Sequence, residues 1–191
     1  MEKFYKILFL ILVIVLLNLS CSQNLTQLTQ NYPIVYNTHN VNDIVNLYAD
    51  DAVFEVAGQF SLSGKDQIRG ITKYDSVLNI KMSVSNIETV KDSVFCNLSE
   101  TNDWLQIAEI DEAHYSVIFV FKDGLISKII ASAKPETAKA FNNVLTRLMI
   151  WAKENRSDLL AEMMPRGKFI YNAENATKTL SLLTEWKEST K

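Results

Sequence analysis

Residues 41–58 read VNDIVNLYADDAVFEVAG, and this stretch decides the fold. Apolar residues first recur at helical spacing, at Val41, Ile44, Val45 and Tyr48. The β-branched and aromatic residues that strands prefer come next, at Val53, Phe54 and Val56. Asp50 and Asp51 separate the two patterns, and Asp is favoured in turns. We expect a short amphipathic helix that turns at Asp50–Asp51 into a strand closed by Gly58.

The composition is that of an ordinary globular protein, with 48% hydrophobic and 10% aromatic residues but only 5 Gly and 3 Pro among 191 residues. About 170 residues that follow an N-terminal leader suit one domain with a substantial core. The net charge of -3 comes without a run of Lys and Arg that could hold a phosphate backbone, so we expect no nucleic-acid partner.

The N-terminus has the pattern of an export signal. Lys3 and Lys6 precede an unbroken apolar run over residues 7–17, which is too short to span a bilayer comfortably. Leu19-Ser20-Cys21 resembles a bacterial lipobox, although Asn18 stands where the usual motif has Leu. We expect residues 1–21 to be a lipoprotein signal that ends at a lipidated Cys21, which would anchor the chain to a membrane of the bacterial cell envelope. Ordinary signal cleavage and an uncleaved anchor are the alternatives.

The remaining segments predict one mixed domain. Residues 22–31 are polar and uncharged, which suits a tether. If Cys21 carries lipid, Cys96 is the one thiol left, and we expect it to be a buried small hydrophobic residue. A strand at Phe60–Leu62 precedes an amphipathic helix over residues 65–77, and strands follow around residues 82–90, 113–121 and 125–132. Lys122-Asp123-Gly124 is a hairpin turn between the last two. Residues 94–110 are expected to begin as a strand and to continue into an irregular section around Asn102-Asp103.

The C-terminal third is predicted to be helical. Pro135 is well placed to start a helix that runs to Asn155, a shorter helix reaches Met164, and a last one covers residues 173–186. We expect this extension, residues 135–191, to pack on the same domain, either over the mouth of a pocket or across the outer face of the sheet.

Several motifs in this order resemble the SnoaL-like branch of the nuclear transport factor 2-like superfamily. They are residues 42–45 with 47–54, then Gly64-Lys65-Asp66-Gln67-Ile68, and Phe119-Val120-Phe121-Lys122-Asp123-Gly124-Leu125-Ile126. The resemblance covers residues 32–134. It implies an α+β, cone-shaped domain in which a curved antiparallel sheet folds around N-terminal helices and leaves a pocket.

The superfamily holds both enzymes and binding domains, so the fold leaves function open. The resemblance implies that the tyrosine of a ketosteroid isomerase site would fall on Tyr32. The general base would fall on Val56 and the protonated acid on Val117, and valine can neither abstract a proton nor donate to an oxyanion. Isomerase chemistry is therefore absent unless another residue supplies it.

Glu100-Thr101-Asn102-Asp103-Trp104 is the most unusual polar stretch, because it lies between apolar strand segments. Glu100 and Asp103 could serve as acid and base, with Asn102 as a donor and Trp104 as a wall. The alternative is a polar strand rim or turn in which Asn and Asp bond the local backbone.

Further candidates line the predicted inner face of the sheet. Tyr115 shares a strand face with Val117, Phe119 and Phe121, and we expect Glu55 and His114 to point outward. Ligand-binding candidates are Phe54, Val56, Tyr74, Asn102, Trp104, Tyr115 and Val117. No histidine stands at metal-ligand spacing, so no metal or other cofactor is expected.

We therefore expect an envelope lipoprotein whose domain binds a small apolar ligand without catalysis. The alternatives are an isomerase, cyclase or hydrolase that uses Glu100–Trp104, with Tyr32 or Tyr115, and an interaction module that forms a homodimer. Buried convergent carboxylates would favour the enzyme, and an open apolar cavity would favour binding.

Overall fold

The structure is a computed structural model that describes residues 24–190. The predicted export signal and the lipidation site Cys21 lie outside the described residues. Within residues 24–190, no helix is both long enough and apolar enough to cross a membrane.

A six-stranded sheet forms the body of the domain, with strand order β2-β1-β6-β5-β4-β3. All neighbouring strands pair antiparallel except β1 and β6, which run parallel. The strands are β1 (Tyr48–Val56), β2 (Phe60–Ser63), β3 (Lys81–Val90), β4 (Ser93–Thr101), β5 (Ala113–Lys122) and β6 (Leu125–Ala133). The predicted α+β fold with a curved sheet is confirmed, with the β1–β6 pair as the exception to antiparallel pairing.

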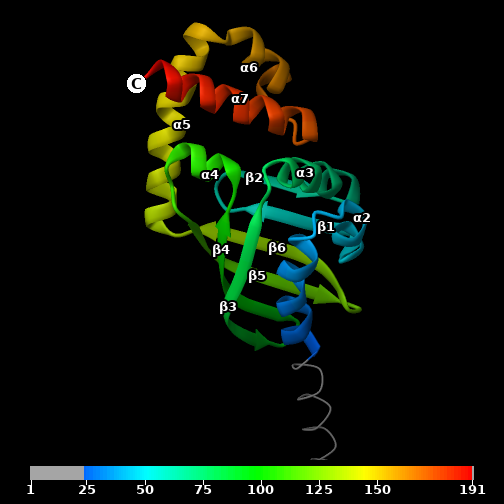
Figure 1. Ribbon diagram of the computed structural model, residues 1–191. Helices are drawn as coiled ribbons and strands as arrows, with labels where there is room; N and C mark the ends of the chain where they lie inside the picture. The colour runs from blue at the N-terminus through cyan, green and yellow to red at the C-terminus, as the bar shows by residue number, and fades with distance from the viewer. Residues whose placement is uncertain (1–23, 191) are drawn as a thin grey trace, which may run out of the picture.

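The helices lie in two groups. One group packs beside the sheet, and the other forms a separate layer at the end of the domain where the C-terminus lies (Figure 1). The first group comprises residues 24–36, α2 (Val41–Asn46), α3 (Lys65–Val77) and α4 (Asp103–Ala108). The second group comprises α5 (Pro135–Asn155), α6 (Ser157–Met163), the 3₁₀ turn η1 (Pro165–Gly167) and α7 (Ala173–Ser189).

The stretch that decides the fold forms a helix and a strand, but the boundary between them differs from the prediction. Asn40 caps α2 through its side chain, and β1 already begins at Tyr48, which is buried. Asp50 and Asp51 lie inside β1, where the pairing with β6 shifts register, so the predicted turn at this pair is wrong. Irregular pairing bends a strand, and in β1 it leaves both carboxylates exposed. Lys65 forms an ion pair with Asp50 at 2.8 Å.

The tether predicted for residues 22–31 is also corrected, because residues 24–31 are helical. Leu25, Thr29, Tyr32 and Tyr36 are all buried on one face of this helix. Their spacing of three or four residues places them on the sheet side. The polar residues between them misled the prediction, since they form the exposed side of an amphipathic helix.

The C-terminal extension packs on the same domain and covers the inner side of the sheet. Helix α5 has the predicted bounds, and α7 packs against α3 and α4. An extended strap, residues 168–171, joins η1 to α7 and crosses α3 at Gly70. A Cβ atom at Gly70 would lie 2.7 Å from the Tyr171 carbonyl oxygen, so the strap and the helix are in direct backbone contact.

The opposite face of the sheet is the outer face. Glu55 pairs there with Lys128 at 3.1 Å, and His114 contacts Ser99 and Glu112. Both orientations agree with the sequence prediction. Phe95 is 42% exposed, so this face also carries apolar surface.

Candidate functional site

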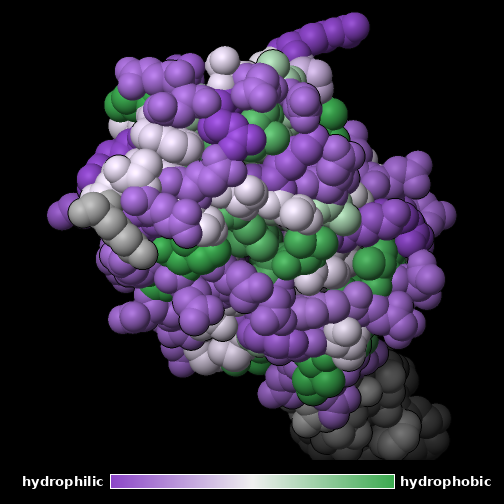
Figure 2. Space-filling model, turned by 45° about the horizontal axis from the view of Figure 1, so that its top comes forward, coloured by the Kyte–Doolittle hydropathy of each residue, from purple (hydrophilic) through white to green (hydrophobic). Residues whose placement is uncertain are grey.

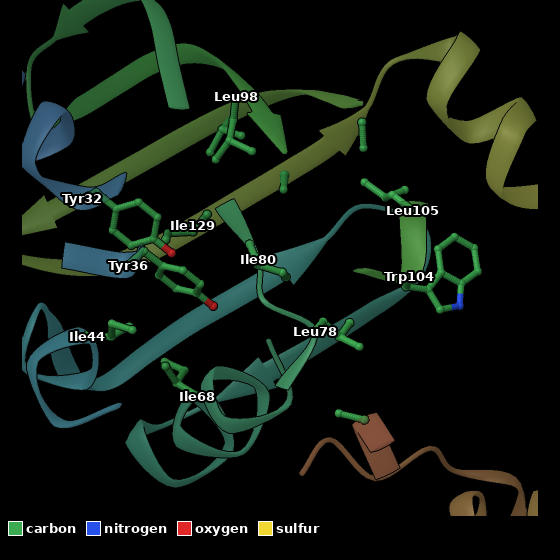
Figure 3. Close-up of a cluster of buried hydrophobic side chains, with 14 of the residues drawn as sticks. Tyr32, Tyr36, Ile44, Ile68, Leu78, Ile80, Leu98, Trp104, Leu105 and Ile129 are labelled. Atoms are coloured by element: carbon green, nitrogen blue, oxygen red, sulfur yellow. The ribbon is translucent and has the colours of Figure 1, made fainter. Parts of the chain in front are cut away.

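A cavity of about 390 Å³ lies between the inner face of the sheet, the N-terminal helix, α3 and the C-terminal extension. This volume falls within the range of small-molecule sites. Figure 3 shows Tyr32 and Tyr36 entering this interior from the N-terminal helix, with Trp104 of α4 at the other end. The extension contributes mainly leucine, methionine and aromatic side chains, namely Phe141, Leu145, Leu148, Met149, Leu160, Met163, Met164, Phe169, Tyr171 and Leu182.

The molecular surface is apolar in part. Figure 2 shows green, hydrophobic side chains in a band across the middle of one face, with hydrophilic residues on both sides. Among the residues of the extension, Leu145 and Ile170 remain 43% and 44% exposed.

The structure brings the predicted site residues together. Every ligand-binding candidate borders the cavity: Phe54, Val56, Tyr74, Asn102, Trp104, Tyr115 and Val117. Glu100 and Tyr32 border it too, whereas Asp103 does not. Asp103 is the first residue of α4, and the rotation between successive helical residues turns it away, toward the amide of Asn79 at 3.5 Å. The predicted pairing of Glu100 with Asp103 as acid and base in this cavity is therefore wrong.

Glu100 lies near the end of β4, next to the residue that caps α4. The Asn102 amide donates a hydrogen bond to Glu100 Oε1 at 2.6 Å, while its own carbonyl oxygen accepts from the Leu105 backbone N–H at 2.7 Å. Burial disfavours the carboxylate and raises the pKa of Glu100 to about 7, although the Asn102 hydrogen bond acts in the opposite direction. Asn102 bonds the local backbone, as the second alternative for this stretch expected, and Glu100 borders the cavity without Asp103.

The second acid in the cavity is Asp75 of α3, which the sequence analysis missed. The Tyr36 hydroxyl donates to Asp75 Oδ2 at 2.5 Å. Burial raises the pKa of Asp75 to about 8, the Tyr36 hydrogen bond lowers it, and the nearby Glu100 raises it further. One signal could have found this residue: Asp75 follows Ile68 by seven positions and Ile71 by four, which places it on the buried stripe of the helix.

Tyrosine hydroxyls surround the two acids. Tyr32 and Tyr48 share a hydrogen bond at 2.8 Å, and Tyr74 donates to Thr179 Oγ1 at 3.2 Å. Burial is the largest cause that raises the pKa of each of these phenols and of Tyr115, so they stay protonated donors. Within residues 24–190, the Tyr115 hydroxyl makes no hydrogen bond, so its donor is available to a ligand.

Basic side chains and metal sites do not contribute to the cavity. None of its described lining residues is Lys, Arg or His. No group of three or more His, Cys, Asp or Glu residues in the described chain could hold a metal ion. Cys96 is buried as predicted, and burial raises the pKa of its thiol to about 11.

Comparison with protein-family models and with curated proteins finds no match. Solved structures do resemble the chain. The epoxide hydrolase/cyclase-like enzyme SalBIII, which acts in pyran ring formation in polyether salinomycin, is 15% identical with a TM-score of 0.54, over 60% of this chain and 94% of that one. A candidate ketosteroid isomerase from Kribbella flavida is 15% identical with a TM-score of 0.51, over 59% and 79%. A de novo designed protein with a curved β-sheet has a TM-score of 0.50 at 14% identity, over 65% and 96%.

These comparisons and the sheet geometry define the class: the chain has the nuclear transport factor 2-like fold, as the sequence predicted. Val56 and Val117, on which the resemblance would place the isomerase acids, border the cavity, whereas the carboxyls that border it come from α3 and β4.

Proposed function

We propose that the domain binds a small, mainly apolar molecule in this cavity, with a polar group of that molecule next to Asp75 and Glu100. The observation that carries the proposal is the cavity of about 390 Å³ with mainly apolar walls, and the two half-buried carboxyls that border it mark where a polar group of the ligand would lie. Taking such groups out of water costs desolvation free energy, and carboxyls with raised pKa values that border a cavity are candidates for contact with a ligand.

The walls support an apolar ligand body. Val117, Phe119 and Ile129 come from the central strands, and Trp104 packs against Phe141 of the extension at 5.7 Å between ring centroids. Removing an apolar ligand surface from water gains roughly 25 cal/mol per Å². The walls therefore supply affinity, and the few polar groups orient the ligand.

Val117→Phe should abolish ligand retention, because Val117 is only 3% exposed and its side chain points into the cavity. The added ring would occupy part of the volume that the ligand needs. The full-length chain, purified in detergent from its own host, would be analysed by native mass spectrometry for a bound small molecule.

Ser116→Phe is the matched control, since Ser116 is the preceding residue of β5 and points to the exposed outer face. We expect the wild type and Ser116→Phe to keep the same bound mass and Val117→Phe to lose it. Equal retention by both variants, or a wild-type chain that is always empty, would contradict the proposal.

Proton-transfer catalysis on the bound molecule is a second candidate function, and the pair of carboxyls favours it. Glu100, with a pKa of about 7, could exchange a proton near neutral pH, while Asp75, with a pKa of about 8, stays a donor. Incubation of the loaded chain in deuterium oxide tests this function. A catalyst would place deuterium on a carbon atom of the ligand, and Glu100→Gln would stop this exchange. A ligand without deuterium on carbon would mean that the domain binds the molecule and does not transfer its protons.

We also propose that Cys21 anchors the domain to a membrane of the cell envelope. The support is the charged start, the apolar run and the Leu19-Ser20-Cys21 sequence. The chain extracted from its host should carry a lipid mass on an N-terminal Cys21, and Cys21→Ser should lack it. Intact-mass measurement that finds an unmodified chain, whether cleaved or not, would refute lipidation.

A further inference from the structure

We propose that the cavity takes a cationic ligand, a molecule whose protonated amine lies between the carboxyl groups of Asp75 and Glu100 and whose apolar body lies among the aromatic walls. This inference rests on the proposed function and specifies the chemical class of its ligand.

The first argument is the unbalanced charge of the cavity. The charge of Glu100 is near enough to raise the pKa of Asp75, yet no basic side chain is among the described residues that line the cavity bordered by both acids. The titratable groups that face the two acids from the N-terminal helix, β1, α3, β5 and the strap are all tyrosines, namely Tyr32, Tyr36, Tyr48, Tyr74, Tyr115 and Tyr171. A cation from outside the described chain would relieve both carboxylates.

The second argument is the pattern of hydrogen bonds. Each acid uses one oxygen within the protein: Oδ2 of Asp75 accepts from Tyr36, and Oε1 of Glu100 accepts from Asn102. Among residues 24–190, nothing donates to the other oxygen of either carboxyl, Oδ1 of Asp75 or Oε2 of Glu100. An ammonium group has three donors and no acceptor, so it suits two open carboxylate oxygens.

The third argument is the aromatic wall around the acids. Tyr32, Tyr36 and Tyr115 border the cavity beside them, and Trp104 stands at its far end. Aromatic faces attract cations, and the attraction grows where water is excluded. Carboxylates combined with aromatic faces therefore select a lipophilic amine over an anion, which both acids would repel.

A neutral ligand that accepts hydrogen bonds from the two protonated acids is the competing solution, and pH separates the two. An amine is bound by ionised carboxylates, so its affinity should rise as the pH increases through the pKa values of about 7 and about 8. A neutral acceptor is bound by the protonated acids, so its affinity should fall over the same range.

Isothermal titration of the full-length chain in detergent with two matched ligand sets tests the inference. Within each set the apolar part of the molecule is constant, and the attached group is cationic, neutral or anionic in that order. One set is tryptamine, tryptophol and indole-3-propionate, and the other is octylamine, octanol and octanoate. Both amines keep their charge throughout the range pH 6 to 8.5, because primary amines titrate near pH ~10.

At pH 8.5 we expect at least one amine to bind about tenfold or more tightly than its neutral partner, and to weaken roughly tenfold on going to pH 6. Asp75→Asn and Glu100→Gln should each remove most of this preference. Asp103→Asn is the control, because Asp103 lies nearby on α4 but does not border the cavity, and it should leave the preference intact.

Absence of amine preference in both sets, including absence of any amine binding, would overturn the inference. Tighter binding of a neutral partner, or a neutral molecule as the retained ligand, would overturn it while leaving the proposed binding function in place. An empty wild-type chain together with no binding in either set would overturn both the inference and the proposed binding function.

Discussion

At pH 8, the Asp75→Asn variant should unfold at a higher temperature than the wild type. Asp75 has a pKa of about 8 in the folded protein because it is buried, whereas an unfolded Asp titrates near pH ~4. The folded state therefore binds the proton more tightly, and wild-type stability is fully present below the unfolded pKa and declines as the pH rises toward 8. Asn has no such proton, and its carbonyl oxygen can still accept from the Tyr36 hydroxyl.

One group of this kind changes the free energy of unfolding by about 1.4 kcal/mol per pH unit between its two pKa values. The carboxyl also borders a cavity, which softens its desolvation, so we expect a difference on the order of 3 kcal/mol at pH 8, or roughly 6 to 12 °C in Tm. Below pH 4 the two proteins should be nearly equal. Calorimetric melting from pH 4 to 9 measures this difference.

Asp50→Asn is the control, since Asp50 is exposed and the pKa of its carboxyl is lowered by its hydrogen bond to Lys65. This variant should show no gain at high pH. A wild-type Tm that does not fall between pH 5 and pH 8, or an Asp75→Asn variant that is less stable at every pH, would show that Asp75 does not carry a raised pKa.

Gly70→Ala should destabilise the protein, because it changes the junction between the strap and α3. Alanine normally stabilises an exposed helix position by up to about 1 kcal/mol relative to glycine. Here its Cβ would lie 2.7 Å from the Tyr171 carbonyl oxygen, a backbone atom that can move only with the strap. Overpacking of this kind costs about 1–3 kcal/mol, so we expect alanine to destabilise the protein at this position and to lower the Tm by roughly 2 to 12 °C.

The displaced strap should also loosen the cavity wall, because the Tyr171 ring packs on Phe60 at 4.8 Å and on Tyr74 at 5.4 Å between centroids. Hydrogen exchange of residues 168–172 should speed up, and ligand retention should weaken. Lys73→Ala, at an exposed position of the same helix, should do neither. A Gly70→Ala variant with a raised Tm and unchanged exchange would mean that the strap does not depend on this contact.

The sequence predicted the fold well where periodicity and turn chemistry agree. The hairpin at Asp123-Gly124 and helix α5 are observed where they were expected. The predictions failed where polar residues occupy regular structure. Asp50 and Asp51 are tolerated in β1 because the strand is irregular and exposed there. The helix at residues 24–31 was missed because Thr and Gln lie between its few apolar contacts.

The sequence predicted where the cavity lies but not all of the polar groups that border it. Strand alternation was sufficient to place Val56, Tyr115 and Val117 at the cavity. The pairing of Glu100 with Asp75 needed tertiary contacts, because the two residues come from β4 and α3. Asp103 was chosen because it is near Glu100 in sequence, whereas the helix that Asn102 caps turns it elsewhere. The same features that hide Asp75, burial and a place on an apolar helix face, give it an unusual pKa.

The order in which the walls are synthesised has a consequence for how the chain matures. The sheet and its first helices are complete by Ala133, whereas the parts that close the cavity, α5 to α7 and the strap, are made afterwards. Until they dock, apolar residues such as Trp104 and Tyr74 lack the aromatic neighbours that later cover them, Phe141 and Phe169. A nascent chain that stalls near Pro135 would thus expose the apolar inner face of the sheet to chaperones and proteases.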